Sequence, residues 1–191
     1  LLSTDDAEVR ITVFSSSIIR VFIDKTENDG DELPYAVVEK PQNTKFEVKE
    51  TEDVIFIRTS KFKVMVSRRP LRISFTNLEG KFLNEDDCSF GTGWMGDTVV
   101  TYKALMEGEK FIGLGEKTGP LNRAGNAYTQ WNTDHFGYPT NADPIYLSTP
   151  FYMGIHKEGH YGIFLNNSHR SVINFGASND RFSSIQAEGG P

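Results

Sequence analysis

The sequence predicts an all-β fold of two stacked antiparallel sheets. Three observations predict it: apolar residues alternate with polar ones along short segments, turn residues separate those segments, and no window of about eleven residues keeps a helical period. The chain has 191 residues, enough for one ample domain with its own hydrophobic core. We therefore expect residues 1–191 to form a single antiparallel β-sandwich domain.

Alternation is clearest in the first half of the chain. Residues 9–13, 62–66 and 71–75 place valine, isoleucine, leucine or phenylalanine at every second position. Successive side chains of a strand point to opposite faces, so each segment predicts a strand with one buried face. The denser apolar run Asp53–Ile57 predicts a strand that is covered on both faces.

Turn residues join these segments into hairpins. Asn77–Gly80 supplies asparagine and glycine between the segment at 71–77 and the shorter one at 81–83. Lys157–His160 plays the same part between residues 151–156 and 161–166. Two further strands are expected at residues 171–175 and 181–185.

Lys117–Thr149 differs from the rest of the chain. It is rich in glycine, asparagine, proline and aromatic residues and has little periodicity. A loop of this length in a compact domain is usually functional or disordered. Its aromatic residues favour order, and they are Tyr128, Trp131, Phe136, Tyr138 and Tyr146. We expect an ordered, functional segment.

Composition excludes several classes of partner and cofactor. The net charge is −6 and lysine and arginine are not clustered, which argues against nucleic acid. The single cysteine, Cys88, permits neither an internal disulfide nor a cysteine-based zinc site. No apolar run approaches the ~20 residues that cross a bilayer, so we expect no membrane partner. The chain begins at Leu1 without methionine or a basic leader, which indicates a processed or trimmed product and leaves the compartment open.

Two arrangements resemble metal or cofactor motifs only in part. His156 and His160 have the spacing of a helical metal site, but Gly154 and Gly159 interrupt the segment, so no metal is expected. Gly113–Gly115 lacks the third glycine of a dinucleotide loop and predicts a tight turn, so no cofactor is expected either.

Carboxylates near the irregular segment suggest sugar chemistry. Glu116, Asp134 and Asp143 lie in or beside it, but their spacing does not place two at the separation that glycoside cleavage requires. Trp131–Phe136 combines aromatic faces with amide and carboxylate groups. Sugars present apolar C–H faces and hydroxyl groups, so this run predicts carbohydrate contact.

Four motifs, in order, resemble those of glycoside hydrolase family 31. They are Phe111–Glu116, Trp131–Asp134, Pro144–Phe151 and Tyr161–Ser168. The resemblance implies an amino-terminal sandwich of the galactose mutarotase-like (supersandwich) kind. It also implies a catalytic (β/α)8 barrel after residue 191, absent from this chain.

The resemblance implies roles for named residues. The family's catalytic aspartates, which act with retention of configuration, belong to the barrel, so no catalytic residue is expected in this chain. Asp134 matches the family's aspartate that hydrogen-bonds a sugar hydroxyl. Phe136 stands where some relatives carry threonine and would stack on sugar, and Trp131 would buttress the loop. Gly115 and Glu116 match a structural motif, in which the carboxylate could accept backbone N–H bonds.

The predicted function is an accessory, substrate-pocket-forming domain of a retaining α-glucosidase-type hydrolase that acts on α-linked glucosides or oligosaccharides. Its partners would be the oligosaccharide and the catalytic barrel of its own full-length chain, and the isolated fragment would be inactive. One alternative is a mutarotase-type or epimerase-type enzyme with a His/Glu pair, in which His156, His160 or His169 is the acid. Another is a freestanding carbohydrate-binding or scaffolding module.

Overall fold

A computed structural model describes residues 2–3, 7–25 and 36–190, and these residues form strands and loops without a helix. Every strand pairing is antiparallel, which confirms the predicted all-β class. The chain divides into two compact units, residues 1–85 and residues 86–190. The assignment of residues 1–191 to one domain stays a prediction.

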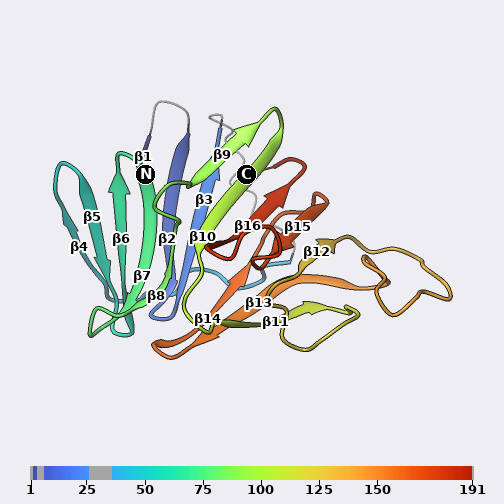
Figure 1. The fold of residues 1–191 in the computed structure, drawn as a ribbon. Coiled ribbons are helices and arrows are strands. Elements are labelled where there is room, and N and C mark those ends of the chain that lie inside the picture. Colours follow the sequence, from blue (N-terminus) through green and yellow to red (C-terminus); the bar gives the residue numbers. More distant parts are fainter. Residues whose placement is uncertain (1, 4–6, 26–35, 191) are drawn as a thin grey trace. The chain divides into compact units, whose positions relative to one another are not determined.

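Unit 1 contains two sheets, with strand orders β1-β2-β3 and β4-β5-β6-β7-β8 (Figure 1). Neighbours in each sheet are consecutive in the chain, as in a series of hairpins. The strands are β1 (Leu2–Ser3), β2 (Glu8–Ser15), β3 (Ile18–Asp24), β4 (Glu47–Glu50), β5 (Val54–Arg58), β6 (Phe62–Arg68), β7 (Leu71–Asn77) and β8 (Phe82–Glu85).

The core of unit 1 comes from alternate residues of both sheets. Val9 of β2 packs in one cluster with Val64 and Val66 of β6 and with Ile73 of β7, and all four are buried. The predicted strands at 9–13, 62–66 and 71–75 are therefore confirmed. The prediction that the strand at 53–57 is covered on both faces is wrong, because Phe56 on one face of β5 is 43% exposed. A run of apolar residues marks burial on one face but does not guarantee a second covering layer.

The hairpin predicted at Asn77–Gly80 joins β7 to β8. The backbone N–H of Asn77 donates to the carbonyl of Lys81 at 2.9 Å, and the Asn77 side-chain oxygen accepts the Lys81 N–H at 2.9 Å. Gly80 has φ = 87°, the left-handed conformation for which glycine is suited. The turn chemistry thus fixes this corner of the sheet.

Unit 2 also contains two sheets, with orders β12-β15-β16-β10-β9 and β11-β13-β14. The predicted hairpin at Lys157–His160 is confirmed as the β13–β14 connection. The strands are β9 (Thr92–Met95), β10 (Thr98–Ala104), β11 (Lys110–Gly115), β12 (Ala127–Gln130), β13 (Ser148–His156), β14 (Gly159–Phe164), β15 (Ser171–Asn174) and β16 (Phe182–Ala187).

The two sheets of unit 2 share one aromatic core. Phe111 of β11 stacks on Phe175 with ring centroids 4.3 Å apart, and Tyr152 of β13 meets the Phe175 ring edge-on at 4.9 Å. Tyr128 of β12 and Ile173 of β15 complete the buried cluster from the other sheet. Unit 2 is therefore a two-sheet antiparallel sandwich, the architecture that the sequence predicts.

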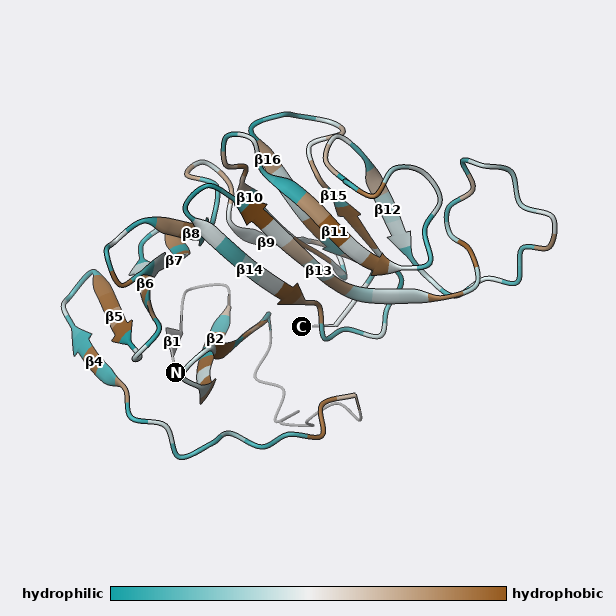
Figure 2. Ribbon diagram, turned by 90° about the horizontal axis from the view of Figure 1, so that it is seen from below, coloured by the Kyte–Doolittle hydropathy of each residue, from teal (hydrophilic) through white to brown (hydrophobic). Residues whose placement is uncertain are grey.

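The irregular segment Lys117–Thr149 contains one strand that the sequence reading missed. Residues 127–130 form β12, in which Tyr128 and Gln130 are buried and Ala127 is exposed. Four residues give too little alternation to predict a strand among so many loop residues. Residues 131–147, between β12 and β13, protrude from the sheets of unit 2 as a long loop that mixes hydrophilic and hydrophobic residues (Figures 1 and 2). We call residues 131–147 the arm.

Candidate functional site

Strand β11 ends in an unusual backbone conformation directly before the base of the arm. Gly113, Leu114 and Gly115 all have positive φ, at 124°, 76° and 75°. Leu114 holds this conformation with a fully buried side chain, which a branched residue tolerates only where surrounding packing enforces it. The pairing of β11 with β13 shifts register at this point. At Gly113–Gly115, where the sequence predicts a tight turn at the end of a strand, the structure has an irregularity in the last residues of β11 that changes the direction of the chain.

The two glycines are required by close backbone approach to β13. A Cβ on Gly113 would lie 2.5 Å from the carbonyl oxygen of Phe151. A Cβ on Gly115 would lie 2.7 Å from the backbone nitrogen of Thr149 and 2.8 Å from the carbonyl oxygen of Leu147. No side chain fits in either place. Through this close contact, the end of β11 holds the segment where the arm returns to β13.

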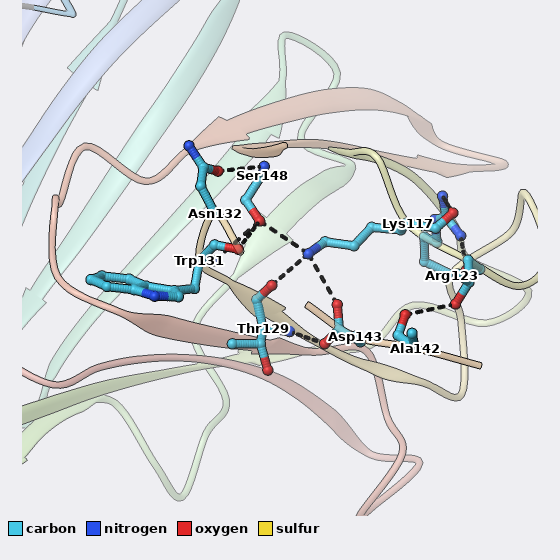
Figure 3. A network of polar contacts seen from close by, with 9 residues as sticks. Lys117, Arg123, Thr129, Trp131, Asn132, Ala142, Asp143 and Ser148 are labelled. Atoms are coloured by element: carbon cyan, nitrogen blue, oxygen red, sulfur yellow. Dashed lines mark hydrogen bonds and ion pairs between the residues drawn. The ribbon is translucent and has the colours of Figure 1, made fainter. Parts of the chain in front are cut away.

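Lys117 follows this irregularity and has a completely buried side chain. Its Nζ lies 3.0 Å from Oδ1 of Asp143 and 3.1 Å from Oγ of Ser148, and it also donates to the carbonyl of Thr129 (Figure 3). An ammonium has three N–H donors, so all three are satisfied. Burial lowers the pKa of Lys117 below its ordinary value of 10.5, and the hydrogen bond and negative charge of Asp143 oppose that shift.

Asp143 and Ser148 connect the hydrogen bonds of Lys117 to the two ends of the arm. The second carboxylate oxygen of Asp143 accepts the backbone N–H of Thr129 in β12. The Ser148 hydroxyl lies 3.1 Å from both the backbone nitrogen and the carbonyl oxygen of Trp131. The Asn132 side chain accepts the Ser148 backbone N–H at 2.7 Å. The start and the end of the arm are thus bound to each other (Figure 3).

Arg123 braces the segment before β12. Its Nη1 donates to the carbonyls of Thr118 at 3.0 Å and Pro120 at 2.8 Å, and its guanidinium carbon lies 5.1 Å from the centroid of the Tyr128 ring. Thr118 in turn donates from its hydroxyl to the carbonyl of Ala142 at 2.9 Å. The base of the arm is therefore built mostly from side chains that bind backbone carbonyls.

The arm has internal contacts of its own. The Tyr146 hydroxyl donates to the carbonyl of His135 at 3.2 Å, and the rings of Tyr138 and Tyr146 meet edge-on at 5.8 Å. Ile145 is buried, and its carbonyl accepts the Thr133 N–H. These contacts give the arm a defined shape while most of its aromatic surface stays exposed.

All three predicted sugar-contact residues lie on the arm. Asp134 is exposed, and its carboxylate has no hydrogen bond or ion pair with the described residues. Phe136 is 95% exposed and Trp131 is 49% exposed. The backbone of Trp131 is fixed by Ser148, but its indole is open to solvent. The arm thus presents two aromatic faces and a free carboxylate within six residues.

The other candidate carboxylates are differently placed. Asp143 helps to hold the base of the arm: one carboxylate oxygen accepts a hydrogen bond from Lys117 Nζ, and the other accepts the backbone N–H of Thr129. Glu116 has an exposed side chain, and its backbone N–H donates to Leu147. The expected acceptance of backbone N–H bonds by the Glu116 carboxylate is not found, since the backbone of Glu116 makes the contact instead. Lys117 and Arg123 belong to no motif, and Ser148 lies within the Pro144–Phe151 motif without a predicted role, so the sequence predicted no function for these three residues.

The histidines of the β13–β14 hairpin point to opposite faces. His156 is buried on the core face, and its Nδ1 accepts the Glu158 N–H at 3.3 Å. His160 pairs with Ile155 on the other face and is exposed. Glu109, near His156, already accepts hydrogen bonds from the Tyr161 hydroxyl and the Met106 N–H. Within residues 7–25 and 36–190, no three histidine, cysteine or carboxylate side chains gather as a metal site.

Unit 2 and the arm together define a class of protein, an antiparallel β-sandwich with a protruding aromatic loop. The sequence matches the glycosyl hydrolase 31 N-terminal galactose mutarotase-like domain over residues 8–174, and the chain belongs to that family. The predicted family and fold are thereby confirmed. The described residues include no helix long and apolar enough to span a membrane.

Individual relatives agree with this assignment. The chain is 29% identical over 188 residues to alpha-glucosidase 2 of Bacillus thermoamyloliquefaciens, covering 97% of this chain and 24% of that protein. It is 32% identical over 81 residues to an alpha-glucosidase of Saccharolobus solfataricus. A solved structure of a mutant GH31 dextranase of Flavobacterium johnsoniae, in complex with isomaltotriose, is 30% identical with a TM-score of 0.89. That match covers 97% of this chain and 23% of the dextranase, so the chain spans about a quarter of the dextranase and of alpha-glucosidase 2.

Proposed function

We propose that this chain is the accessory, substrate-pocket-forming domain of a retaining α-glucosidase-type hydrolase that acts on α-linked glucosides or oligosaccharides. The observation that carries the proposal is the arm, a firmly anchored loop whose aromatic rings and one unpaired carboxylate face solvent. Asp134 would accept hydrogen bonds from a sugar hydroxyl, Phe136 would stack on a sugar face, and Trp131 would support both. The named relatives, two alpha-glucosidases and a dextranase, support an α-linked glucoside as the substrate class.

The catalytic residues would lie in a (β/α)8 barrel elsewhere in the full-length protein. A surface of unit 2 supports such a partner, the outer face of sheet β11-β13-β14. Register places Met153 beside Ile112 and Phe151 opposite Phe164 on this face, and Phe151, Met153 and Phe164 are 41%, 37% and 44% exposed. The uncovered face of an antiparallel sheet is normally polar, and an exposed apolar patch marks an interaction surface.

Activity assays on two forms of the protein test the proposal. The full-length protein is expected to release glucose from a nitrophenyl α-glucoside or an α-linked oligosaccharide with retention of configuration. The isolated 191-residue chain is expected to be inactive, since the paired acid and nucleophile would lie in the barrel. Hydrolysis by the purified isolated chain, with contaminating enzyme excluded, would contradict the proposal, as would a full-length protein inactive on every α-linked glucoside tested.

A further inference from the structure

We infer that Lys117 is the positioning residue of the arm: its buried ammonium holds both ends of residues 131–147 and thereby sets where Trp131 and Asp134 stand. This inference rests on the proposed function for its consequence in sugar binding. The anchoring itself can be measured without any activity.

The three acceptors of the ammonium come from three different stretches of chain. Thr129 lies at the end of β12, two residues before the arm begins, Asp143 lies near the arm's end, and Ser148 is the first residue of β13. The contacts span 12, 26 and 31 residues of sequence. The Lys117 nitrogen therefore contacts both stems of the loop, which strand pairing does not join because β12 and β13 belong to different sheets. One backbone hydrogen bond, from the Thr133 N–H to the Ile145 carbonyl, joins the two sides of the arm beyond these stems.

The tie continues from the ammonium to the arm itself. Ser148 Oγ contacts Lys117 Nζ on one side and the backbone N and O atoms of Trp131 on the other, all at 3.1 Å. Asp134 follows Trp131 by three residues, and the Asn132 side chain between them is bound to the Ser148 N–H. A series of short polar contacts thus connects the buried Lys117 ammonium to the start of the arm and fixes the position of the candidate sugar-binding residues there.

Burial makes this cation dependent on its partners. A charged group removed from water is tolerated only where hydrogen bonds and an opposite charge replace its hydration. The Lys117 side chain is 0% exposed and that of Asp143 is 19% exposed, so water can hydrate neither charge well. Removing either charge leaves the other buried and uncompensated, and the stems of the arm are expected to separate to hydrate it.

The experiment compares Lys117→Met with Lys103→Met in the full-length protein. Lys103 makes a second deeply buried ion pair in the described part of unit 2. Its Nζ lies 2.6 Å from Oδ1 of Asp86, the two side chains are 13% and 6% exposed, and the pair does not involve the arm. Hydrogen exchange of peptides from residues 128–149 is expected to be about tenfold faster or more in Lys117→Met, because the charge-assisted hydrogen bonds at the stems of the arm are lost. Exchange in the β13–β14 hairpin is expected to stay unchanged, and Lys103→Met is expected to leave the arm protected.

A second variant covers the case in which Lys117→Met unfolds the domain. Ser148→Ala removes only the hydroxyl that links Lys117 to Trp131, and it is expected to raise exchange at Trp131 with little change in melting temperature. Equal protection of the arm in wild type and in both Lys117→Met and Ser148→Ala would overturn the inference. So would an equal loss of protection in Lys103→Met, because any buried ion pair would then have the same effect.

Kinetics separates this inference from the proposed function. With an α-glucoside substrate, Lys117→Met is expected to raise KM about tenfold while kcat changes less, the pattern for a residue that positions a binding group. Faster arm exchange without any change in KM would support the anchoring role and contradict sugar contact by the arm. Unchanged exchange would refute the anchoring role whatever the enzyme hydrolyses.

Discussion

The hydroxyl of Tyr161 donates a 2.8 Å hydrogen bond to Oε1 of Glu109, joining β14 to the turn before β11. The other oxygen of this carboxylate accepts the Met106 N–H at 3.0 Å. Glu109 is only 8% exposed, and burial raises its pKa above the ordinary value of 4.5, while these hydrogen bonds and the nearby charge of His156 act in the opposite direction. Desolvation outweighs the hydrogen bonds, so the folded state binds the proton more tightly than the unfolded state does.

This relationship predicts a pH dependence of stability. Since the folded-state pKa of Glu109 is raised, its contribution to the free energy of unfolding is most favourable below 4.5 and declines as the pH rises through the window between 4.5 and the raised pKa. Glu109→Gln removes this titration. Urea unfolding of both proteins is expected to give a wild-type stability that falls, relative to Glu109→Gln, as the pH rises above 4.5. A difference independent of pH, or one that grows in favour of the wild type, would contradict the assignment.

Two glycines with nearly the same φ give a matched test of the β11 irregularity. Gly115 has φ = 75° and its added Cβ would meet two backbone atoms within 2.8 Å, whereas Gly125 has φ = 76° and open space around it. Gly125→Ala is expected to cost about 1–2 kcal/mol, the price of a left-handed alanine. Gly115→Ala carries the same cost and a backbone clash in addition, so a total of about 3 kcal/mol or more is expected.

Urea unfolding of the two alanine variants measures this difference. Equal destabilisation would mean that the approach of Gly115 to Leu147 and Thr149 leaves room for a Cβ and does not itself require glycine. A larger destabilisation by Gly115→Ala would show that the close backbone contact, and not φ alone, requires glycine at this position.

Phe136 is expected to contribute to binding and not to folding. Its ring is 95% exposed, so Phe136→Ala should leave the melting temperature unchanged. If the ring stacks on sugar, KM for an α-linked oligosaccharide should rise about two- to tenfold, from an aromatic contact worth 0.5–1.5 kcal/mol. Phe136→Tyr keeps the ring and should behave as wild type, while Phe136→Leu should resemble alanine. An unchanged KM in Phe136→Leu would contradict the proposal that the Phe136 ring stacks on sugar.

The strands were predictable where local patterns decide the structure. Alternation at 62–66 and 71–75 and the turn residues at Asn77–Gly80 fixed a hairpin because all the information lies within a few neighbouring residues. The same alternation runs through both halves of the chain, so it could not reveal that residues 1–85 and 86–190 have separate cores. Which core a buried residue belongs to depends on which sheets face each other, and the alternation of apolar residues along a strand does not contain that information.

The arm was predictable as a segment, but its anchor was not. Tryptophan, asparagine, aspartate and phenylalanine within six residues predict carbohydrate contact by their chemistry, and that contact stays a prediction. Lys117 and Asp143 are 26 residues apart and individually look like surface charges. Only the close packing of β11 against the segment leading into β13 buries them together, and that packing depends on glycines whose conformation a sequence does not display.

The most direct measurement of the central claim is kcat/KM of the full-length protein with Asp134→Ala, compared with Glu116→Ala. Both side chains are exposed carboxylates of unit 2, one on the arm and one at its base. Loss of a charge-assisted hydrogen bond to sugar predicts a fall of about 10- to 100-fold for Asp134→Ala. Glu116→Ala is expected to stay within about twofold of wild type. An Asp134→Ala enzyme as efficient as the wild type on every α-linked substrate it cleaves would contradict the claim that the arm contacts sugar through this residue.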